Sequence, residues 1–274
     1  MTITEARPEA KSFVEAVIRY TDPASAGAKL NSQDHDSSTF KLLEHTFPVY
    51  NARLANPKIS FEQNGFTMFK HKTDVNLLDK EAVTKTYYGE AAEIVKALTG
   101  ASDVIVFLDL IRSEDRSGEP LGAEPAGNAH IDFDERSVKL WVKTLRPNDA
   151  DRLLAKRRIL NMNLWRPIRS VERRPLAICD AQSVSTRDLI PIMISGRPSD
   201  PGGPFSGYNL AYNPNHRWWY YPDLQTDEVL AFKIYDSDDE RPYLTAHTAF
   251  DDPASREGAP KRISHEIRTI AFFD

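Results

Sequence analysis

The second half of the chain is a succession of short apolar runs, and this pattern limits the folds open to the protein. Runs of strand length follow one another from residue 129, separated by Pro, Gly, Asn and Asp: AHIDFD, VKLWVKT, ILNMNLW, PLAICD, YNLAYN, RWWYY, EVLAFKIY, LTAHTAF and RISHEIRTIAFF. One segment, DADRLLAKR (149–157), has a helical pattern instead. Such runs are typical of an antiparallel barrel or jelly roll. The sequence therefore predicts a mainly β fold with flanking helices around a double-stranded β-helix, a cupin-like jelly roll.

The segments before residue 101 predict elements that pack on this core. Apolar residues in 13–18 fit a short helical stripe. ISFEQ and FTMFKHK flank Asn64-Gly65, which is a strong signal for a two-residue hairpin turn. Residues 79–99 have the periodicity of a helix that stops at Gly100. We expect one domain over 1–274, in which a helix and hairpin region (1–100) packs on the β core (101–274).

Two segments lead from this region into the β core. VIVFLDLI (104–111) is a continuous apolar run, which predicts a strand buried on both faces. Residues 112–128 are polar and rich in Gly and Pro, so they predict a loop that delivers the chain to His130. A lid over a site at His130 and plain disorder are both compatible with this loop.

The composition excludes several classes of protein. The 274 residues carry a formal net charge of −5 and no stripe of Lys and Arg, which argues against a nucleic-acid partner. No apolar stretch is long enough for a membrane span, and the first residues lack the apolar core of a secretory signal. Cys179 is the only cysteine, so an internal disulfide or a cysteine zinc cluster is excluded. We expect a soluble cytoplasmic protein; the oligomeric state stays open.

The triplet His130-Ile131-Asp132 is the first candidate metal motif. Side chains alternate along a strand, so His130 and Asp132 point to the same face. Two imidazoles and one carboxylate on one side of an ion leave three positions open, as in non-haem Fe(II) oxygenases. Asp134 continues the alternation and competes with Asp132, but it lies one repeat further from His130. We therefore prefer Asp132 as the carboxylate and expect Asp134 to cap or orient the site.

A second histidine must close the site, and His216 and His247 are the candidates. We prefer His247 because it comes shortly before the last strand, whose polar face holds Arg262, Ser264, Glu266 and Arg268. If that strand returns antiparallel, Arg262 lies about 10 Å below the metal level. Its guanidinium and the Ser264 hydroxyl would there bind the distal carboxylate of a five-carbon diacid. Arg268 would lie nearer the metal and the substrate, and it remains the alternative ligand of this carboxylate.

The chain resembles the hydroxylase/desaturase family of secondary metabolism, which includes the oxygenase of cephamycin 7α-methoxylation and the fungal gibberellin desaturase. The stretches that carry the resemblance are NGF (64–66), YYGEAAEIVKALTGAS (87–102), HIDFD (130–134), NLWRPI (163–168), PLAICDAQSV (175–184), HRWWYYPDLQTDEVLAFKIYDS (216–237), AHTAFDDP (246–253) and RISHEIR (262–268). Two stretches depart from the family pattern: FLDLIR (107–112) is less polar than expected, and His265 replaces an apolar residue.

This resemblance implies Fe(II), 2-oxoglutarate and O2 on a double-stranded β-helix, with a small secondary metabolite as substrate. The combined hypothesis is a 2-oxoglutarate-dependent dioxygenase in which His130, Asp132 and His247 bind iron. Hydroxylation, desaturation and oxidative cyclisation all remain open. The alternatives are an isomerase or hydrolase that uses the same triad without O2, and a barrel that binds a small molecule without catalysis. Arg262 and Ser264 discriminate, because only a diacid cosubstrate requires them.

Overall fold

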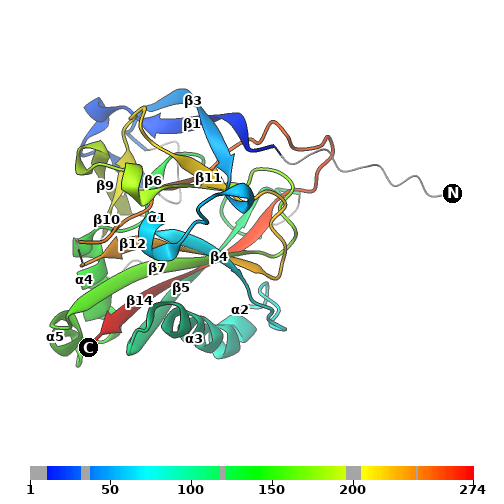
Figure 1. The fold of residues 1–274 in the computed structure, drawn as a ribbon. Coiled ribbons are helices and arrows are strands. Elements are labelled where there is room, and N and C mark those ends of the chain that lie inside the picture. The colour runs from blue at the N-terminus through cyan, green and yellow to red at the C-terminus, as the bar shows by residue number, and fades with distance from the viewer. Residues whose placement is uncertain (1–10, 32–37, 118–120, 196–204, 239) are drawn as a thin grey trace.

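Two β-sheets face each other in the computed structural model, which describes residues 11–31, 38–117, 121–195, 205–238 and 240–274 (Figure 1). The strands of the larger sheet are β1 (Phe13–Thr21), β2 (Lys29–Asn31), β3 (Leu42–Asn51), β6 (His130–Ile131), β8 (Leu176–Cys179), β9 (Leu189–Ser195), β10 (Phe205–Leu210), β11 (Trp218–Tyr220) and β13 (His247–Ala249). The smaller sheet consists of β4 (Phe66–Lys70), β5 (Asp103–Ser113), β7 (Arg158–Pro167), β12 (Glu228–Asp236) and β14 (Ile263–Phe273).

The strand order places the late strands at the centre of both sheets. It is β1-β3-β11-β8-β13-β6-β10-β9-β2 in the larger sheet and β4-β12-β7-β14-β5 in the smaller one. Apolar side chains from both sheets, among them Ile18, Trp218 and Phe232, form one hydrophobic cluster. These two facing sheets confirm the predicted mainly β, jelly-roll fold.

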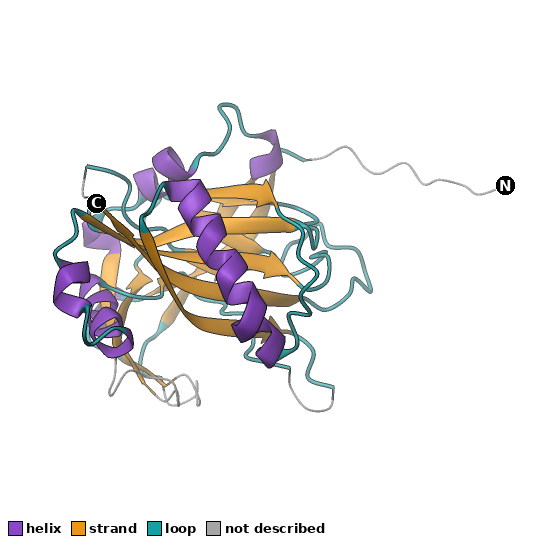
Figure 2. Cartoon of the chain, turned by 90° about the horizontal axis from the view of Figure 1, so that it is seen from below, coloured by secondary structure: helices purple, strands orange, loops and turns teal. Residues whose placement is uncertain are grey.

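The helices lie outside the two facing sheets. They are α1 (Phe61–Asn64), α2 (Lys80–Ala82), α3 (Tyr88–Thr99), α4 (Glu135–Leu145) and α5 (Ala150–Leu154), with a π-helical turn at Val83–Tyr87 and 3₁₀ turns at Pro23–Ser25, Ala52–Leu54, Ala181–Ser183 and Thr186–Asp188. Helix α3 crosses the outer face of the smaller sheet (Figure 2). Its buried residues form a second hydrophobic cluster with the outward side chains of β7, β12 and β14. The predicted helix at 79–99 and its stop at Gly100, which has φ +75°, are confirmed.

Residues 13–18, predicted to be helical, are instead part of strand β1. Val14, Ala16, Ile18 and Tyr20 are buried and alternate with more exposed neighbours, which is the period of a strand. β1 pairs antiparallel with β3, and β3 pairs parallel with β11. The N-terminal region therefore adds strands to the larger sheet as well as supplying helices.

The predicted hairpin at Asn64-Gly65 is also wrong. Ser60 accepts a hydrogen bond from the backbone N–H of Gln63 and begins the short helix α1. Gly65 ends this helix in the left-handed conformation, with φ +82°, and β4 follows directly. Only the second half of the predicted hairpin is therefore a strand.

Two further predictions need correction. VKLWVKT, predicted as a strand, lies in α4, where Val138, Trp141 and Val142 share a buried helical face. The run 104–111 is a strand, β5, but most of its side chains are only half-buried because β5 is an edge strand of the smaller sheet. The predicted helix at 149–157 is confirmed as the shorter α5. The predicted loop at 112–128 begins after β5 ends at Ser113, and three of its residues (118–120) lie outside the described residues.

Candidate functional site

The two histidines of the predicted triad lie opposite each other on neighbouring strands. β6 and β13 pair antiparallel with His130 directly across from His247. Their ring centroids are 4.4 Å apart. Neighbouring strands approach to this distance throughout a sheet, so the ladder itself sets the spacing of the two imidazoles.

Asp132 follows β6 and completes the cluster. Its Oδ1 lies 4.0 Å from Nε2 of His130, and its Oδ2 lies 3.7 Å from Nε2 of His247. The candidate ligand atoms of the three residues are all within 4.8 Å of one another. Two imidazole nitrogens and one carboxylate at this spacing match the donor set of a non-haem Fe(II) centre, and a single ion between them would be held on one side only.

Burial keeps both imidazoles in the form that can bind a metal. The pKa of His130 is lowered to about 4, mainly by burial and then by the neighbouring His247. Burial likewise lowers the pKa of His247. Nδ1 of His130 donates to the backbone carbonyl of Asn128 over 2.8 Å, which leaves the lone pair on Nε2 facing Asp132.

Hydrogen bonds from the smaller sheet fix the carboxylate of Asp132. Nη2 of Arg268 donates to Oδ1 over 2.7 Å, and Nδ2 of Asn163 donates to Oδ2 over 2.8 Å. Glu266 accepts from Nε of Arg268 over 3.0 Å. Arg268 and Asn163 are register partners on β14 and β7, so one rung of the smaller sheet holds both oxygens of Asp132.

A glycine allows the strand beside the triad to come close. β10 pairs with β6, and a Cβ on Gly207 would lie 2.6 Å from the backbone oxygen of Asp132 and 2.7 Å from that of Ile131. Atoms at these distances clash, so only glycine fits at this position. The position of Asp132 therefore depends on a residue that carries no functional group.

Arg262 and Ser264 lie on the same inward face of β14 and its N-terminal extension as Glu266 and Arg268. Both are buried, at 2% and 0% exposure. Nη1 of Arg262 donates to the backbone carbonyl of Arg174 over 2.7 Å, and its guanidinium stacks on the ring of Trp165. Among the residues that the structure describes, Nε of Arg262 and Oγ of Ser264 have no hydrogen-bond partner. Buried polar atoms of this kind are normally satisfied, so they point to a bound anion.

Arg112 is a further residue on this face. It ends the stretch FLDLIR (107–112), but no sequence motif gave it a role in the site. It is the register partner of Ser264 on β5. The only signal in the sequence was an arginine that ends the apolar run 104–111, which is also what a solvent-facing strand end looks like.

The alternative candidates His216 and Asp134 lie outside the triad and form hydrogen bonds that stabilise the fold. His216 is buried between Tyr20 and Asp188, with each contact at 3.2 Å. Asp134 accepts from the backbone N–H of Ser137 over 2.8 Å and caps α4, as expected of a residue beside the site.

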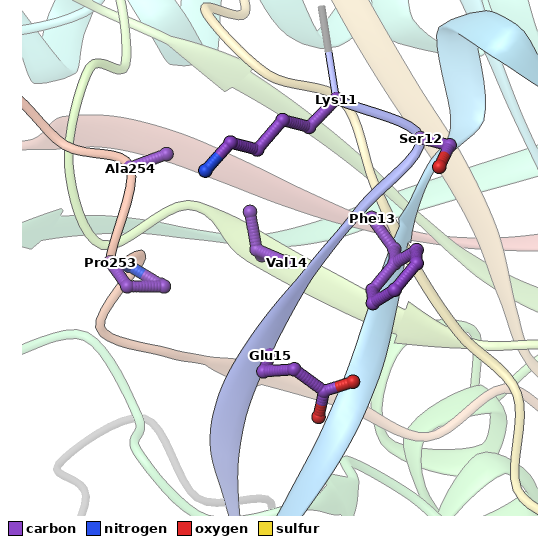
Figure 3. Close-up of a pocket in the computed structure, with 7 residues that line it drawn as sticks. All are labelled: Lys11, Ser12, Phe13, Val14, Glu15, Pro253 and Ala254. Carbon is purple, nitrogen blue, oxygen red and sulfur yellow. The ribbon is translucent and has the colours of Figure 1, made fainter.

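A pocket elsewhere on the molecule does not contain the triad. Lys11, Ser12, Phe13, Val14, Glu15, Pro253 and Ala254 line it (Figure 3). It lies against β1, at the end of the larger sheet and four strands away from β13. Among the lining residues, Glu15 alone has a carboxylate or imidazole that could bind a metal ion. The pocket therefore lacks the groups that the predicted chemistry needs.

The described helices include none that is both long enough and apolar enough to cross a membrane.

Comparisons with known proteins agree with this geometry. A family model described as an oxidoreductase/YMDC permease-like domain matches residues 18–272. The hydroxylase/desaturase efuI of Hormonema carpetanum is 32% identical over 285 residues, which cover 95% of each chain. The α-ketoglutarate-dependent dioxygenase phiK of a fungal species is 33% identical over 274 residues, which cover 96% of this chain and 97% of the relative.

Solved structures give the same result. The iron and α-ketoglutarate-dependent endoperoxidase NvfI superimposes with a TM-score of 0.85 and 25% identity, over 96% of this chain and 99% of its own. The sequence of the Fe(II)/2-oxoglutarate-dependent dioxygenase nvfI of Aspergillus novofumigatus is 28% identical over 86% of each chain. The family predicted from the sequence motifs is confirmed: the chain belongs to the Fe(II)/2-oxoglutarate-dependent hydroxylases, desaturases and dioxygenases, and is an oxidoreductase that uses Fe(II), 2-oxoglutarate and O2.

Proposed function

We propose that His130, Asp132 and His247 hold the Fe(II) of this oxygenase. The observation that carries the proposal is the convergence of two neutral imidazoles and one carboxylate whose ligand atoms lie within 4.8 Å. When bound, Fe(II) with 2-oxoglutarate and O2 supplies the oxidising power to break an unactivated C–H bond of the substrate. The three side chains would hold the metal and leave room beside it for the cosubstrate and O2.

Arg268 and Asn163 have a positioning role in this proposal. Their hydrogen bonds to the two oxygens of Asp132 fix the plane of the carboxylate before the metal binds. Two nitrogens of the Arg268 guanidinium, Nε and Nη2, already donate to Glu266 and Asp132, whereas Nη1 has no partner among the described residues. This arrangement favours Arg262 over Arg268 as the ligand of the cosubstrate.

Arg262 and Ser264 bind the distal carboxylate of 2-oxoglutarate in this proposal. Their unpartnered Nε and Oγ atoms are the donors that such a carboxylate would satisfy. The aromatic ring of Trp165 beneath the guanidinium keeps Arg262 in place and excludes water from the contact.

The described chain acts as one catalytic domain in this proposal, because both sheets contribute to the same site. Its substrate is a small secondary metabolite, as expected from relatives named as hydroxylases and desaturases. We also propose a cytoplasmic location. Hydroxylation, desaturation and cyclisation depend on where a C–H bond lies relative to the metal.

An anaerobic titration tests the metal site. Addition of 2-oxoglutarate to the purified protein with Fe(II) should produce a visible charge-transfer band, and subsequent exposure to O2 should consume 2-oxoglutarate. The variants His130→Ala and Asp132→Ala should give no band while retaining the wild-type circular dichroism spectrum. His216→Gln is the matched control, because this buried histidine lies between Tyr20 and Asp188. A band that survives in both triad variants and disappears in His216→Gln would move the metal site to His216.

A further inference from the structure

Three arginines lie on the inward face of β14 and β5. In the antiparallel register Ser264 faces Arg112, and Arg268 faces Leu108. Arg262 extends the same ladder one rung further, because its backbone oxygen accepts from the N–H of Glu114 over 3.0 Å. Residues two apart on a strand point the same way, so Arg262, Ser264 and Arg112 face the same side as Arg268.

The three guanidiniums differ in how their charge is compensated. Arg268 forms salt bridges with Asp132 and Glu266. Arg262 and Arg112 donate instead to the backbone carbonyls of Arg174 and Glu124, each within 2.8 Å. Within the described ranges, neither Arg262 nor Arg112 forms a salt bridge with a carboxylate.

The charges of Arg262 and Arg112 lie close enough to repel each other, although neither forms a direct salt bridge with a described carboxylate. The pKa of Arg262 is lowered to about 9, first by burial and next by the positive charge of Arg112. Arg112 therefore lies within electrostatic reach of Arg262.

Two guanidiniums and an unpartnered hydroxyl in such a place favour the binding of an anion. A buried charge without a partner is costly, and a carboxylate that accepts from both arginines would remove the repulsion between them. Ser264 is the direct register partner of Arg112 and lies two residues from Arg262, so its free Oγ belongs to the same group of donors.

We propose that Arg112 is a second guanidinium of the cosubstrate site, which together with Arg262 and Ser264 grips the distal carboxylate of 2-oxoglutarate. This inference rests on the proposed function and adds a specificity-determining residue to it. The pair of arginines makes the site selective for a dicarboxylate, because a 2-oxo acid without the second carboxylate leaves both charges unsatisfied.

Binding measurements on the Fe(II)-loaded protein test this proposal without turnover. Anaerobic calorimetry should give an affinity for 2-oxoglutarate that is about 10- to 100-fold lower in Arg112→Gln, the effect of one lost charge-assisted contact. The wild type should prefer 2-oxoglutarate strongly to 2-oxopentanoate, in which a methyl group replaces the distal carboxylate. Arg112→Gln should reduce this preference by lowering the affinity for 2-oxoglutarate alone, and Arg112→Lys should restore part of it.

The matched control is Arg116→Gln. Arg116 lies in the loop after β5 and donates to Glu124 and Gly122, but it is exposed. This variant should retain the wild-type preference. A thermal-melting experiment separates binding from structure: without ligand, Arg112→Gln should melt no lower than the wild type, because the repulsion with Arg262 is relieved. The stabilisation produced by added 2-oxoglutarate should shrink.

The outcomes separate this inference from the proposed function. If Arg262→Gln loses 2-oxoglutarate affinity and Arg112→Gln keeps it, the role of Arg112 is refuted and the proposed function stands. If Arg112→Gln weakens substrate binding alone, Arg112 recognises an anionic substrate and the proposal is likewise overturned. If the wild-type protein with Fe(II) binds no 2-oxoglutarate, the proposed function itself fails.

Discussion

Arg268 donates a hydrogen bond of 2.7 Å to Asp132, and this contact joins the smaller sheet to the candidate metal site in the larger one. We predict that Arg268→Gln lowers Fe(II) affinity by about 10- to 100-fold, as expected when the partner of a metal ligand is removed. Competition with a fluorescent metal indicator measures this affinity.

The control for this prediction is Arg262→Gln. Arg262 lies on the same strand face but contacts no triad residue through a described hydrogen bond, so its loss should leave Fe(II) affinity unchanged. If Arg268→Gln binds Fe(II) normally and instead loses 2-oxoglutarate, Arg268 holds the cosubstrate and our assignment of the two arginines is reversed.

Gly207→Ala should damage the site without touching any of its functional groups. The added methyl would press on the backbone oxygens of Ile131 and Asp132, and overpacking of this kind costs about 1–3 kcal/mol. Denaturant unfolding should show the lost stability, and Fe(II) affinity should fall with it. Gly89→Ala on the exposed face of α3 is the control: nothing lies within 4 Å of its Cβ, and it should stabilise the helix. Equal Fe(II) affinity in both variants would contradict the prediction.

Gly65→Ala should destabilise the protein more than Gly100→Ala. Both glycines have the left-handed backbone conformation, with φ +82° at Gly65 and +75° at Gly100. Each substitution by alanine therefore costs about 1–2 kcal/mol in backbone strain. At Gly65 the new Cβ would also lie 2.6 Å from Cγ2 of Thr245, whereas at Gly100 it meets nothing within 4 Å. Thr245 cannot turn away easily, because its hydroxyl donates to the backbone oxygen of Lys233.

The difference between the two variants is therefore the test, and unfolding in urea measures it. Gly65→Ala should also reduce Fe(II) affinity, since the backbone oxygen of Thr245 lies 3.5 Å from Nδ1 of His247. Similar stability losses in Gly65→Ala and Gly100→Ala would show that the contact with Thr245 relaxes.

His216 should make stability depend on pH. Burial lowers its pKa in the folded protein, so as pH falls below about 6.5 the unfolded chain takes up the proton first and stability falls. The carboxylate of Asp188, 3.2 Å from Nε2, favours the protonated ring, but burial outweighs this effect and the pKa is lowered overall. The contribution of His216 to the free energy of unfolding is complete above about pH 6.5. It decreases as the pH falls towards the lowered pKa of His216 in the folded protein.

Urea unfolding of His216→Gln measures this contribution. The slope of the unfolding free energy between pH 7.5 and 5.5 should be shallower in His216→Gln than in the wild type, by at most about 1.4 kcal/mol per pH unit. The comparison isolates His216 because the triad histidines are present in both proteins. Identical slopes would mean that His216 titrates normally in the folded protein.

The sequence predicted the late strands well because their alternation coincides with burial on one face. β1 shows where this reasoning fails. Phe13 and Val17 are apolar yet exposed, at 42% and 43%, and they obscure the period of two formed by Val14, Ala16 and Ile18. An apolar residue on a surface is common, so a short run cannot distinguish a strand from a helix by pattern alone.

One local signal was misleading where a second local signal, a helix cap, decides the structure. Asn64-Gly65 has the composition of a hairpin turn, but the cap at Ser60 makes the preceding residues helical, and Gly65 serves as the stop. In α4 the β-branched Val138 and Val142 suggested a strand, although the cap at Asp134 and the buried Trp141 specify a helix. In both cases the capping residue, Ser60 or Asp134, outweighs the strand-like run beside it.

The candidate site was predictable to the extent that it follows strand alternation. The His130–Asp132 spacing and the shared face of Arg262, Ser264 and Arg268 both follow from a period of two. Arg112 could not be found in this way, because its place opposite Ser264 depends on which strand is the neighbour of β14. Strand order is a property of the whole fold, and no local pattern encodes it.

Successive side chains of β14 point to opposite faces of the smaller sheet. One face is polar and faces the triad, and the other is apolar and packs under α3. Insertion or deletion of one residue in this strand would exchange the two sides and bury the arginines under the helix. Conservative substitutions on the apolar side of β14 therefore preserve the site, whereas a change of length does not. New substrate preferences should arise in the connections between strands, while the length of this strand stays fixed among enzymes that keep the chemistry.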